Sequence, residues 1–332
     1  MAGRVGERRR GRRGASARLT RLGGGLHSAE VQGGQAAAPP VLVGENMQTD
    51  VTEEAGVIEL IRRALDEDIG AGDATTLALV PPATVVEAVI LARPAVVVCG
   101  GDVARAVFQQ LDPAVICNAC VADGAAAPAG AVIMEIRGRA QSILTGERTA
   151  LNFMQRLTGI ATFTRRFVER VAAHGTAILD TRKTTPTLRA LEKYAVRCGG
   201  GQNHRMGLYD RVMIKDNHRQ LSGVAGGLTL DAAVVRARER SPGLAVEVEV
   251  ETLDELALAL KAGPEWILLD NMTPALMREC VGRIAGRCKV EASGGVTLES
   301  VAAVAATGVD AISLGCLTHS APAADLSLEI VM

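Results

Sequence analysis

The sequence predicts an α/β protein in two parts, a strand-rich α+β unit followed by an open or closed barrel of alternating strands and helices. The first observation is a repeated strand–helix pattern after residue 176, which is typical of a parallel sheet. The second is a group of strand patterns between residues 84 and 137 with few helices among them. The third is composition: 48% of the 332 residues are hydrophobic but only 2% are aromatic. Aliphatic cores of this kind suit helices packed on parallel strands.

The first part combines short strands with a few helices. Apolar residues at helical spacing predict a helix near residues 57–65. Strands are predicted at 84–92, 95–99, 114–117 and 131–137, with a helix at 102–111 and a turn at 124–130. A long helix or a broken pair of helices is predicted at 146–173, with Thr145 as a possible N-cap and Gly159 weakening the middle.

In the second part strands and helices alternate. The predicted strands are 176–181, 211–216, 245–251, 266–270, 289–293 and 310–315. The predicted helices are near 187–198, 228–240, 252–261, 274–285 and 297–306. In βα barrels the chemistry lies where the strands end, so the residues at those ends are the candidates for a functional site.

Residues 1–46 differ from the rest of the chain. They combine an arginine run, Arg8–Arg13, with Gly, Ala and Ser and with few acids. Such a segment cannot bury much apolar surface, and we expect it to be disordered. It is interpreted as a transit peptide, as a nucleic-acid-binding arm, or as an upstream extension without function. We favour the last, because Met47 begins a well-patterned segment and the many glycines spoil an amphipathic helix.

The charge and the cysteine content limit which cellular compartment and which binding partners we expect. The formal net charge is −1, which gives no general attraction to nucleic acid. Seven cysteines without a disulfide framework predict reduced thiols and a cytoplasmic protein. Cys117 and Cys120 form a lone C-x-x-C, which we interpret as incidental thiols in preference to a metal or redox pair. The sequence contains no charge-free run of 18 apolar residues, so we expect no membrane span.

Cationic side chains gather at the ends of two neighbouring predicted strands. Arg182 and Lys183 follow the strand at 176–181, and Lys215 ends the strand at 211–216. Between them, a glycine-rich turn carries His204 and Arg205. Placing these groups together costs repulsion, so the pattern predicts a bound anion.

Two further features predict how phosphate and metal are held. Glu249 and Asp270 lie near the ends of adjacent predicted strands, where carboxylates either pair with lysines or hold Mg²⁺ beside a phosphate. Ser293-Gly294-Gly295 lies between a strand and a plausible helix start near Thr297, and Gly315 follows one unit later. Backbone N–H groups at such turns cradle phosphates, so together these features suggest phosphoryl or phosphoribosyl chemistry.

These motifs resemble those of the quinolinate phosphoribosyltransferase family, in consistent order from about residue 50 to 330. The matching segments are Glu67–Thr76, Gly146–Phe153, Asp180–Pro186, Gly199–Arg205, Ile214–His218, Glu247–Val250, Leu268–Asn271, Ser293–Gly295 and Leu314–Ser320. The Cys117/Cys120 pair is not a feature of the resemblance.

The resemblance implies an amino-terminal α/β sandwich domain followed by an open α/β barrel. Its boundaries would be residues 47–155, with a return of the tail at about 320–332, and residues 156–319. It further implies a homodimer in which one subunit's amino-terminal domain closes the other's barrel, with higher assemblies occurring in the family. The implied reaction joins quinolinate to phosphoribosyl pyrophosphate with Mg²⁺, giving nicotinate mononucleotide, pyrophosphate and CO₂ in NAD synthesis.

The resemblance also implies residue roles. Arg182, His204, Arg205 and Lys215 resemble the quinolinate-binding set, joined by Arg148 from the partner subunit. Lys183 resembles the lysine that faces the pyrophosphate, and Glu249 and Asp270 resemble the acidic pair at the ribose and the metal. The 5′-phosphate site would comprise Ser293, Gly294, Gly295, Gly315 and His319.

Two alternatives share the same fold. One is a related phosphoribosyltransferase-like protein of metal-transport operons, which need not use quinolinate. The cation set at residues 182, 204, 205 and 215 argues against it. The other is a non-catalytic sensor of a phosphate ligand, which the presence of Lys183 together with the acidic pair argues against.

Overall fold

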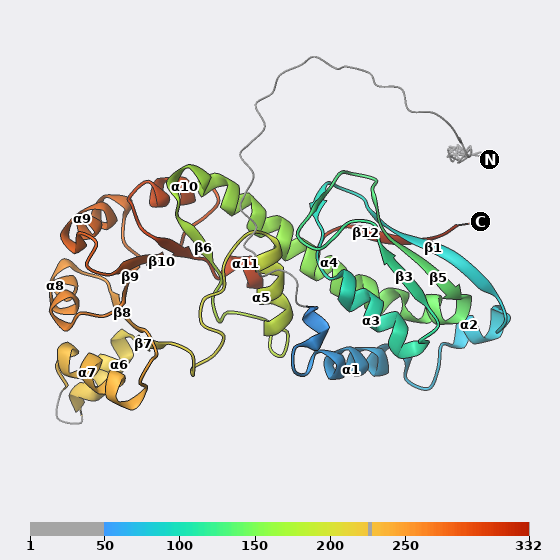
Figure 1. The fold of residues 1–332 in the computed structure, drawn as a ribbon, viewed down its shortest axis with the longest axis horizontal. Coiled ribbons are helices and arrows are strands. Elements are labelled where there is room, and N and C mark those ends of the chain that lie inside the picture. The colour runs from blue at the N-terminus through green and yellow to red at the C-terminus, as the bar shows by residue number, and fades with distance from the viewer. Residues whose placement is uncertain (1–49, 225–227, 332) are drawn as a thin grey trace, which may run out of the picture. The chain divides into compact units, whose positions relative to one another are not determined.

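The computed structural model describes residues 50–224 and 228–331, and these form an antiparallel-sheet unit and a parallel α/β unit (Figure 1). The α/β class expected from the sequence is confirmed. The extension predicted at residues 1–46 lies outside the described residues.

The first sheet has four antiparallel strands in the order β12–β1–β5–β3. Their bounds are β1 (Val85–Ala92), β3 (Ile116–Ala119), β5 (Val132–Arg139) and β12 (Leu326–Val331). Along β1 the buried positions alternate, at Ala88, Ile90 and Ala92, so one face of the sheet meets the core. A second, two-stranded sheet pairs β2 (Val96–Val97) with β4 (Ala126–Ala127). The predicted turn at 124–130 is therefore wrong in part, because it contains a strand.

Short helices belong to the same unit as this antiparallel sheet. A 3₁₀ turn η1 (Val51–Glu53) precedes α1 (Val57–Ile69), α2 (Ala74–Leu79) and α3 (Gly101–Leu111). In α1 the buried residues Val57, Ile61 and Leu65 recur every four positions, as the apolar stripe of a surface helix does. Helix α2 begins at the cap Asp73, whose carboxylate accepts the amide of Thr76 at 2.9 Å.

A single 32-residue helix, α4 (Ala140–Val171), connects the two sheets and ends in the 3₁₀ turn η2 (Ala172–His174) (Figure 1). The prediction of Thr145 as its N-cap is wrong. The helix starts directly after β5, and the Thr145 hydroxyl instead donates to Asp73 at 3.1 Å. The helix runs unbroken through Gly159, and the carbonyl of Pro322 occupies the space that a Cβ at this position would need. The glycine thus admits the backbone that leads into β12.

The second sheet is parallel and six-stranded, in the order β6–β11–β10–β9–β8–β7. The strands are β6 (Ala177–Leu179), β7 (Val212–Ile214), β8 (Val246–Val250), β9 (Trp266–Asp270), β10 (Lys289–Ser293) and β11 (Ala311–Ser313). The helices are α5 (Arg189–Cys198), α6 (Asp216–Val224), α7 (Leu230–Arg240), α8 (Leu253–Ala262), α9 (Pro274–Ile284), α10 (Val301–Ala305) and α11 (Cys316–His319). Strands β6 and β7 form the two ends of this order, and no pairing closes them within 50–224 and 228–331.

Two differences from the sequence prediction concern helices near strand ends. Helix α10 begins at Val301, later than the predicted start near Thr297, because Thr297 and Ser300 hydrogen-bond each other in a turn. Helix α6 was not predicted, since its residues were interpreted as the charged end of β7.

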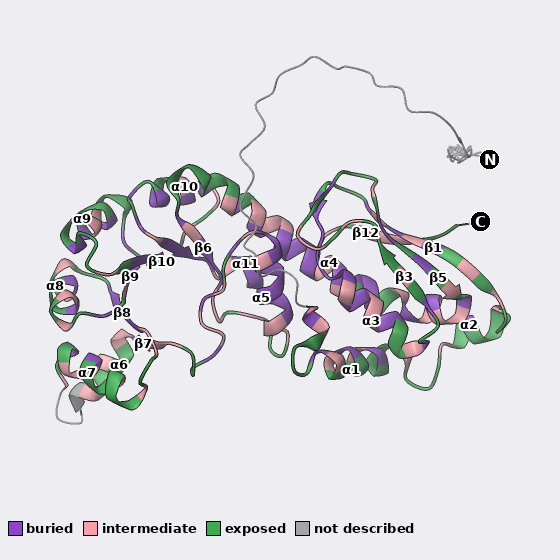
Figure 2. Ribbon diagram, in the orientation of Figure 1, coloured by how far each residue is buried: buried purple, intermediate pink, exposed green. Residues whose placement is uncertain are grey.

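Burial follows the strands and the inner helix faces (Figure 2). All five residues of β8 are buried, including Glu247 and Glu249, and buried carboxylates of this kind require charged partners. The helices described by the structure include none with the length and apolarity needed to span a membrane.

Candidate active site

A cavity of about 260 Å³ opens at the carboxyl ends of the parallel strands. Eight of the residues predicted for a functional site line it together. They are Arg182, Lys183, His204, Arg205, Lys215, Glu249, Asp270 and Ser293. The strand ends of one parallel sheet therefore bring together residues that lie more than 100 positions apart in the sequence.

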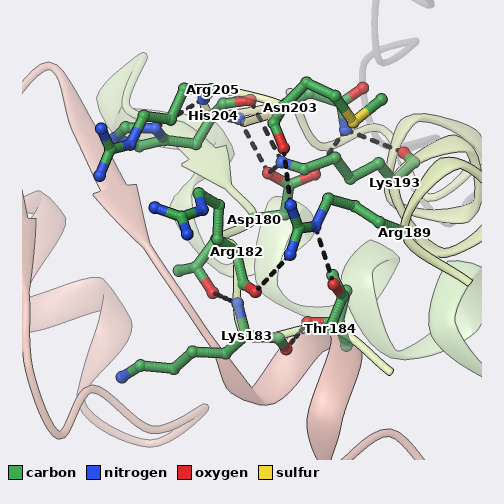
Figure 3. Close-up of polar contacts among 12 residues, drawn as sticks. Asp180, Arg182, Lys183, Thr184, Arg189, Lys193, Asn203, His204 and Arg205 are labelled. Atoms are coloured by element: carbon green, nitrogen blue, oxygen red, sulfur yellow. Dashed lines mark hydrogen bonds and ion pairs between the residues drawn. The ribbon is translucent and has the colours of Figure 1, made fainter. Parts of the chain in front are cut away.

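The positive side of the cavity comes from two loop segments. Arg182 and Lys183 lie in the loop that begins at Asp180 after β6, and His204 and Arg205 lie in the loop after α5 (Figure 3). The carboxylate of Asp180 accepts the amide of His204 at 2.8 Å and the Asn203 side chain at 2.5 Å. Burial and the positive charge of Arg182 lower the pKa of Arg205. This crowding of cations is the electrostatic pattern of an anion site.

The acidic side of the cavity comes from adjacent strands. Glu249 lies on β8 and Asp270 ends β9. Glu249 forms an ion pair with Lys215, which is the alternative that the sequence left open for these carboxylates. Asp270 accepts the Asn271 side-chain amide at 2.9 Å and enters no ion pair among the described residues. Hard carboxylate oxygens at the rim of one cavity are a donor set that fits Mg²⁺.

The predicted phosphate-binding residues fall into two groups at the end of the sheet. Ser293 lines the cavity, and Gly294 follows at φ +93°, where a Cβ would collide with the Asn271 side chain. Gly295 comes next in the same turn. Gly315 precedes α11, and a Cβ there would lie 2.9 Å from the Lys183 side chain and 3.2 Å from His319. Gly315 therefore leaves room for Lys183 and His319 to lie against the start of α11.

Arg148 is placed apart from this group. It is exposed on α4 and does not line the cavity of its own chain. Its predicted role requires a second subunit, and that stays a prediction.

The structure adds a buried acidic pair that was not predicted as part of the site. Glu247 on β8 and Glu291 on β10 each place a carboxylate oxygen 3.3 Å from Nε2 of His204. All three side chains are buried, and Glu291 also lines the cavity. Alternation along β10 places Glu291 on the same side as Ser293, which is the sequence signal that could have identified it.

The charges of this cluster are coupled. Burial alone would lower the pKa of His204, but Glu247 and Glu291 outweigh it and raise the pKa to about 9. The amide of Arg205 approaches Nδ1 at 2.6 Å and favours a neutral ring, yet two buried carboxylates outweigh one amide. Burial raises the pKa of Glu291, whereas His204 and Arg211 hold the pKa of Glu247 low despite its burial. The two carboxylates therefore favour a protonated His204, and burial favours the neutral form of Glu291 over that of Glu247.

This arrangement predicts a pH-dependent contribution of His204 to stability. Because the folded-state pKa is raised above the ordinary value of 6.5, the contribution is complete below about pH 6.5 and is lost as the pH rises through about 9. We expect the difference in unfolding free energy between wild type and His204→Gln to shrink between pH 6 and pH 10. Urea denaturation across this range measures it. A constant difference would show that His204 stays neutral.

The cysteines are free thiols, and the C-x-x-C residues lie outside the cavity lining. Cys117 is partly buried, which raises its pKa to about 11, and Cys120 is exposed with a raised pKa. Thiols that stay protonated are poor nucleophiles and poor metal ligands.

An open parallel α/β unit whose cavity combines cations with two carboxylates, beside a glycine turn, fits the class of enzymes that bind phosphoribosyl groups. Comparison with known proteins identifies the family. The model of the quinolinate phosphoribosyl transferase N-terminal domain matches residues 73–158, and that of the C-terminal domain matches residues 160–329. The chain belongs to the quinolinate phosphoribosyltransferase family.

Individual relatives agree with this assignment. A probable nicotinate-nucleotide pyrophosphorylase (carboxylating) of Bacillus subtilis is 42% identical over 274 residues, covering 82% of this chain and 93% of the relative. Quinolinate phosphoribosyltransferase (decarboxylating) 1 of Nicotiana glauca is 42% identical over 293 residues, covering 83% and 81%. The solved nicotinate-nucleotide pyrophosphorylase of Francisella tularensis superposes with a TM-score of 0.78 at 40% identity, covering 83% of this chain and 96% of that one.

Proposed function

We propose that the cavity at the strand ends is where this protein carries out the reaction of its family. The protein is a carboxylating nicotinate-nucleotide pyrophosphorylase, a phosphoribosyltransferase that converts quinolinate to nicotinate mononucleotide in NAD synthesis. The observation that supports this location is the convergence of cations from two loops with carboxylates from two adjacent strands in one cavity.

The cations orient the dicarboxylate. Quinolinate carries two adjacent carboxylates, and Arg182 and Arg205 offer guanidinium groups that pair with carboxylates in a bidentate manner. His204 and Lys215 complete the set of cations within the chain. To bind quinolinate, Lys215 breaks its ion pair with Glu249. Arg148 of the partner subunit adds a further cation, so the proposed active form is a homodimer. The proposal also includes higher assemblies of such dimers. Fixing both carboxylates directs the ring nitrogen towards the anomeric carbon of the sugar.

Lys183, Glu249 and Asp270 act on the sugar diphosphate. Lys183 neutralises the departing pyrophosphate, and the two carboxylates stabilise the positive charge that develops on the ribose. Glu249 and Asp270 would also hold Mg²⁺, which when bound neutralises charge on the pyrophosphate. Ser293, Gly294, Gly295, Gly315 and His319 bind the 5′-phosphate through backbone and side-chain donors.

Loss of CO₂ follows from the same positioning. Once the ring nitrogen is bonded to the sugar it is cationic. The bond to the 2-carboxylate then breaks, the electron pair stays on the ring carbon beside that nitrogen, and a proton replaces the lost group. Arg182 and Arg205 hold the carboxylates during the first step, so decarboxylation requires one of these ion pairs to open.

The test of this proposal is quinolinate-dependent release of pyrophosphate by the purified protein. We expect release from phosphoribosyl pyrophosphate, with one CO₂ for each pyrophosphate, only when quinolinate is present. Benzene-1,2-dicarboxylate lacks the ring nitrogen and should inhibit without reacting. Release that does not depend on quinolinate would contradict the proposal and favour a protein that uses another acceptor.

Removal of the metal gives a separate prediction. Chelation with EDTA should abolish activity, and added Mg²⁺ should restore it. Asp270→Asn should raise the Mg²⁺ concentration needed for half-maximal activity, because the variant loses one of two carboxylates. Asp254→Asn, on the outer helix α8, is the matched control and should leave the Mg²⁺ titration unchanged. An unchanged titration for Asp270→Asn would remove that residue from the metal site.

The proposal includes a cytoplasmic location. All seven cysteines are free, as expected in a reducing compartment. Fluorescence of a carboxyl-terminally tagged full-length chain in its native cell measures the location, and an organellar signal would instead identify the first 46 residues as a targeting segment.

A further inference from the structure

One face of α5 contacts both segments that carry the cations. Arg189 and Lys193 are four residues apart and therefore lie on the same face of this helix. Both side chains point towards the loops that carry Arg182, Lys183, His204 and Arg205 (Figure 3). Neither residue lines the cavity, so neither is a candidate to touch the substrate.

Lys193 connects the segment that carries Arg182 and Lys183 with the segment that carries His204 and Arg205. Its ammonium group forms a fully buried ion pair with Asp180, the first residue after β6 and two positions before Arg182. The same ammonium donates to the carbonyl of His204 at 3.2 Å, and Asp180 accepts the amide of His204 at 2.8 Å. A buried ion pair contributes little net stability, but its fixed geometry makes it suited to define the position of a loop.

Arg189 ties the same segments together a turn earlier in the helix. Its guanidinium donates to the Thr184 hydroxyl at 3.0 Å and to the carbonyl of Arg182 at 3.4 Å. From its other side it donates to the carbonyl of Met206 at 3.0 Å. One planar side chain thus joins the residues after β6 to the residues after His204 and Arg205.

Lys183 has supports that do not depend on Arg189. Its carbonyl accepts the Thr318 hydroxyl at 2.8 Å, and its side chain lies beside Gly315. Downstream, the amide of Thr185 donates to the buried Glu192 at 3.0 Å. Loss of Arg189 should therefore change the spacing between Arg182 and Arg205 more than it changes the position of Lys183.

We propose that α5 is a positioning element, in which Arg189 and Lys193 set the distance between the Arg182 and Arg205 segments so that the cavity accepts carboxylates on adjacent ring carbons. This inference rests on the proposed function and assigns its specificity for a 1,2-dicarboxylate to two residues outside the cavity lining.

The test uses Arg189→Met in the full-length protein, with Arg238→Met as the matched control. Arg238 also joins a helix to a turn, donating to Gly263 and Glu265, both at 2.6 Å, but at the amino ends of β8 and β9 and outside the cavity lining. We expect kcat/KM for quinolinate to fall by about 10²-fold in Arg189→Met, as a misplacement of about 1 Å does. KM for phosphoribosyl pyrophosphate and the melting temperature should stay close to those of the control. Arg189→Lys should recover part of the loss, because it keeps one donor.

A binding measurement separates positioning from general stability. Calorimetric titration with benzene-1,2-dicarboxylate and benzene-1,3-dicarboxylate reports the distance between the cations without any reaction. Wild type and Arg238→Met should prefer the 1,2-isomer, and Arg189→Met should lose most of that preference. Equal weakening of both isomers, or an unchanged preference, would overturn the proposal. Absence of quinolinate-dependent activity in wild type would instead contradict the proposed function, so the two failures are distinguishable.

Discussion

Lys183→Ala is expected to lower kcat by about 10²-fold or more, the loss that follows when a preorganised charge is removed from a reacting centre. The side chain lines the cavity and lies against Gly315 and next to His319, on the side of the cavity assigned to phosphate. The substitution should not disturb the loop, because the backbone at this position is held through its carbonyl by Thr318. Steady-state kinetics at saturating quinolinate, with the melting temperature measured alongside, reports the effect.

Lys261→Ala is the control for this experiment. Lys261 is an exposed lysine near the end of α8, and its removal should leave both kinetics and melting temperature unchanged. If Lys183→Ala retained the wild-type kcat, the lysine would have no part in the departure of pyrophosphate. A loss confined to KM would assign it to ground-state binding alone.

Arg148→Ala is expected to be inactive by itself, with kcat/KM for quinolinate reduced by about 10²-fold or more. Arg148 is exposed on α4 and outside the cavity of its own chain, so its proposed role requires the residue to enter the cavity of a partner. A mixture with the inactive Lys183→Ala protein should then regain activity. Random exchange in a twofold dimer gives one intact site in half of the dimers, or about a quarter of wild-type activity.

Complementation needs proof that subunits exchange. Differently tagged copies of the two variants, co-purified after mixing, provide it, and tagged wild-type chains provide the reference for full activity. Exchange without recovery would show that Arg148 and Lys183 serve the same site from the same chain or that Arg148 serves none. Activity of Arg148→Ala alone at the wild-type level would contradict the assignment directly.

The residues of the cavity were predictable because the carboxyl ends of parallel strands all lie at one edge of the sheet. Sequence periodicity located β9 and β10 with the bounds that the structure gives, and their last residues, Asp270 and Ser293, line the cavity. A charged residue after a buried strand has few places to lie other than that edge, so a local pattern identified a long-range cluster.

Other features depend on partners that a local pattern does not contain. From the sequence alone, Gly159 is interpreted as a helix-weakening residue, but the structure shows that Pro322 lies beside it. Thr145 is likewise interpreted as a helix cap, but its hydroxyl donates to Asp73. Glu291 reads as an ordinary strand residue until β8 brings Glu247 to the same histidine. In each case tertiary contacts override a local preference, and the contact arises from residues at least 43 positions away in the chain.

The pairing of β12 with β1 has a consequence for biosynthesis. Strand β1 is made early, yet the strand that covers its outer side is made after the entire barrel. At ordinary rates of translation this delay is roughly ten to fifty seconds. Throughout it the nascent chain exposes an unpaired strand edge, which is a template for pairing with neighbouring chains on the same polysome. The extent of aggregation during synthesis should therefore depend on how long that edge stays unpaired before residues 326–331 are made.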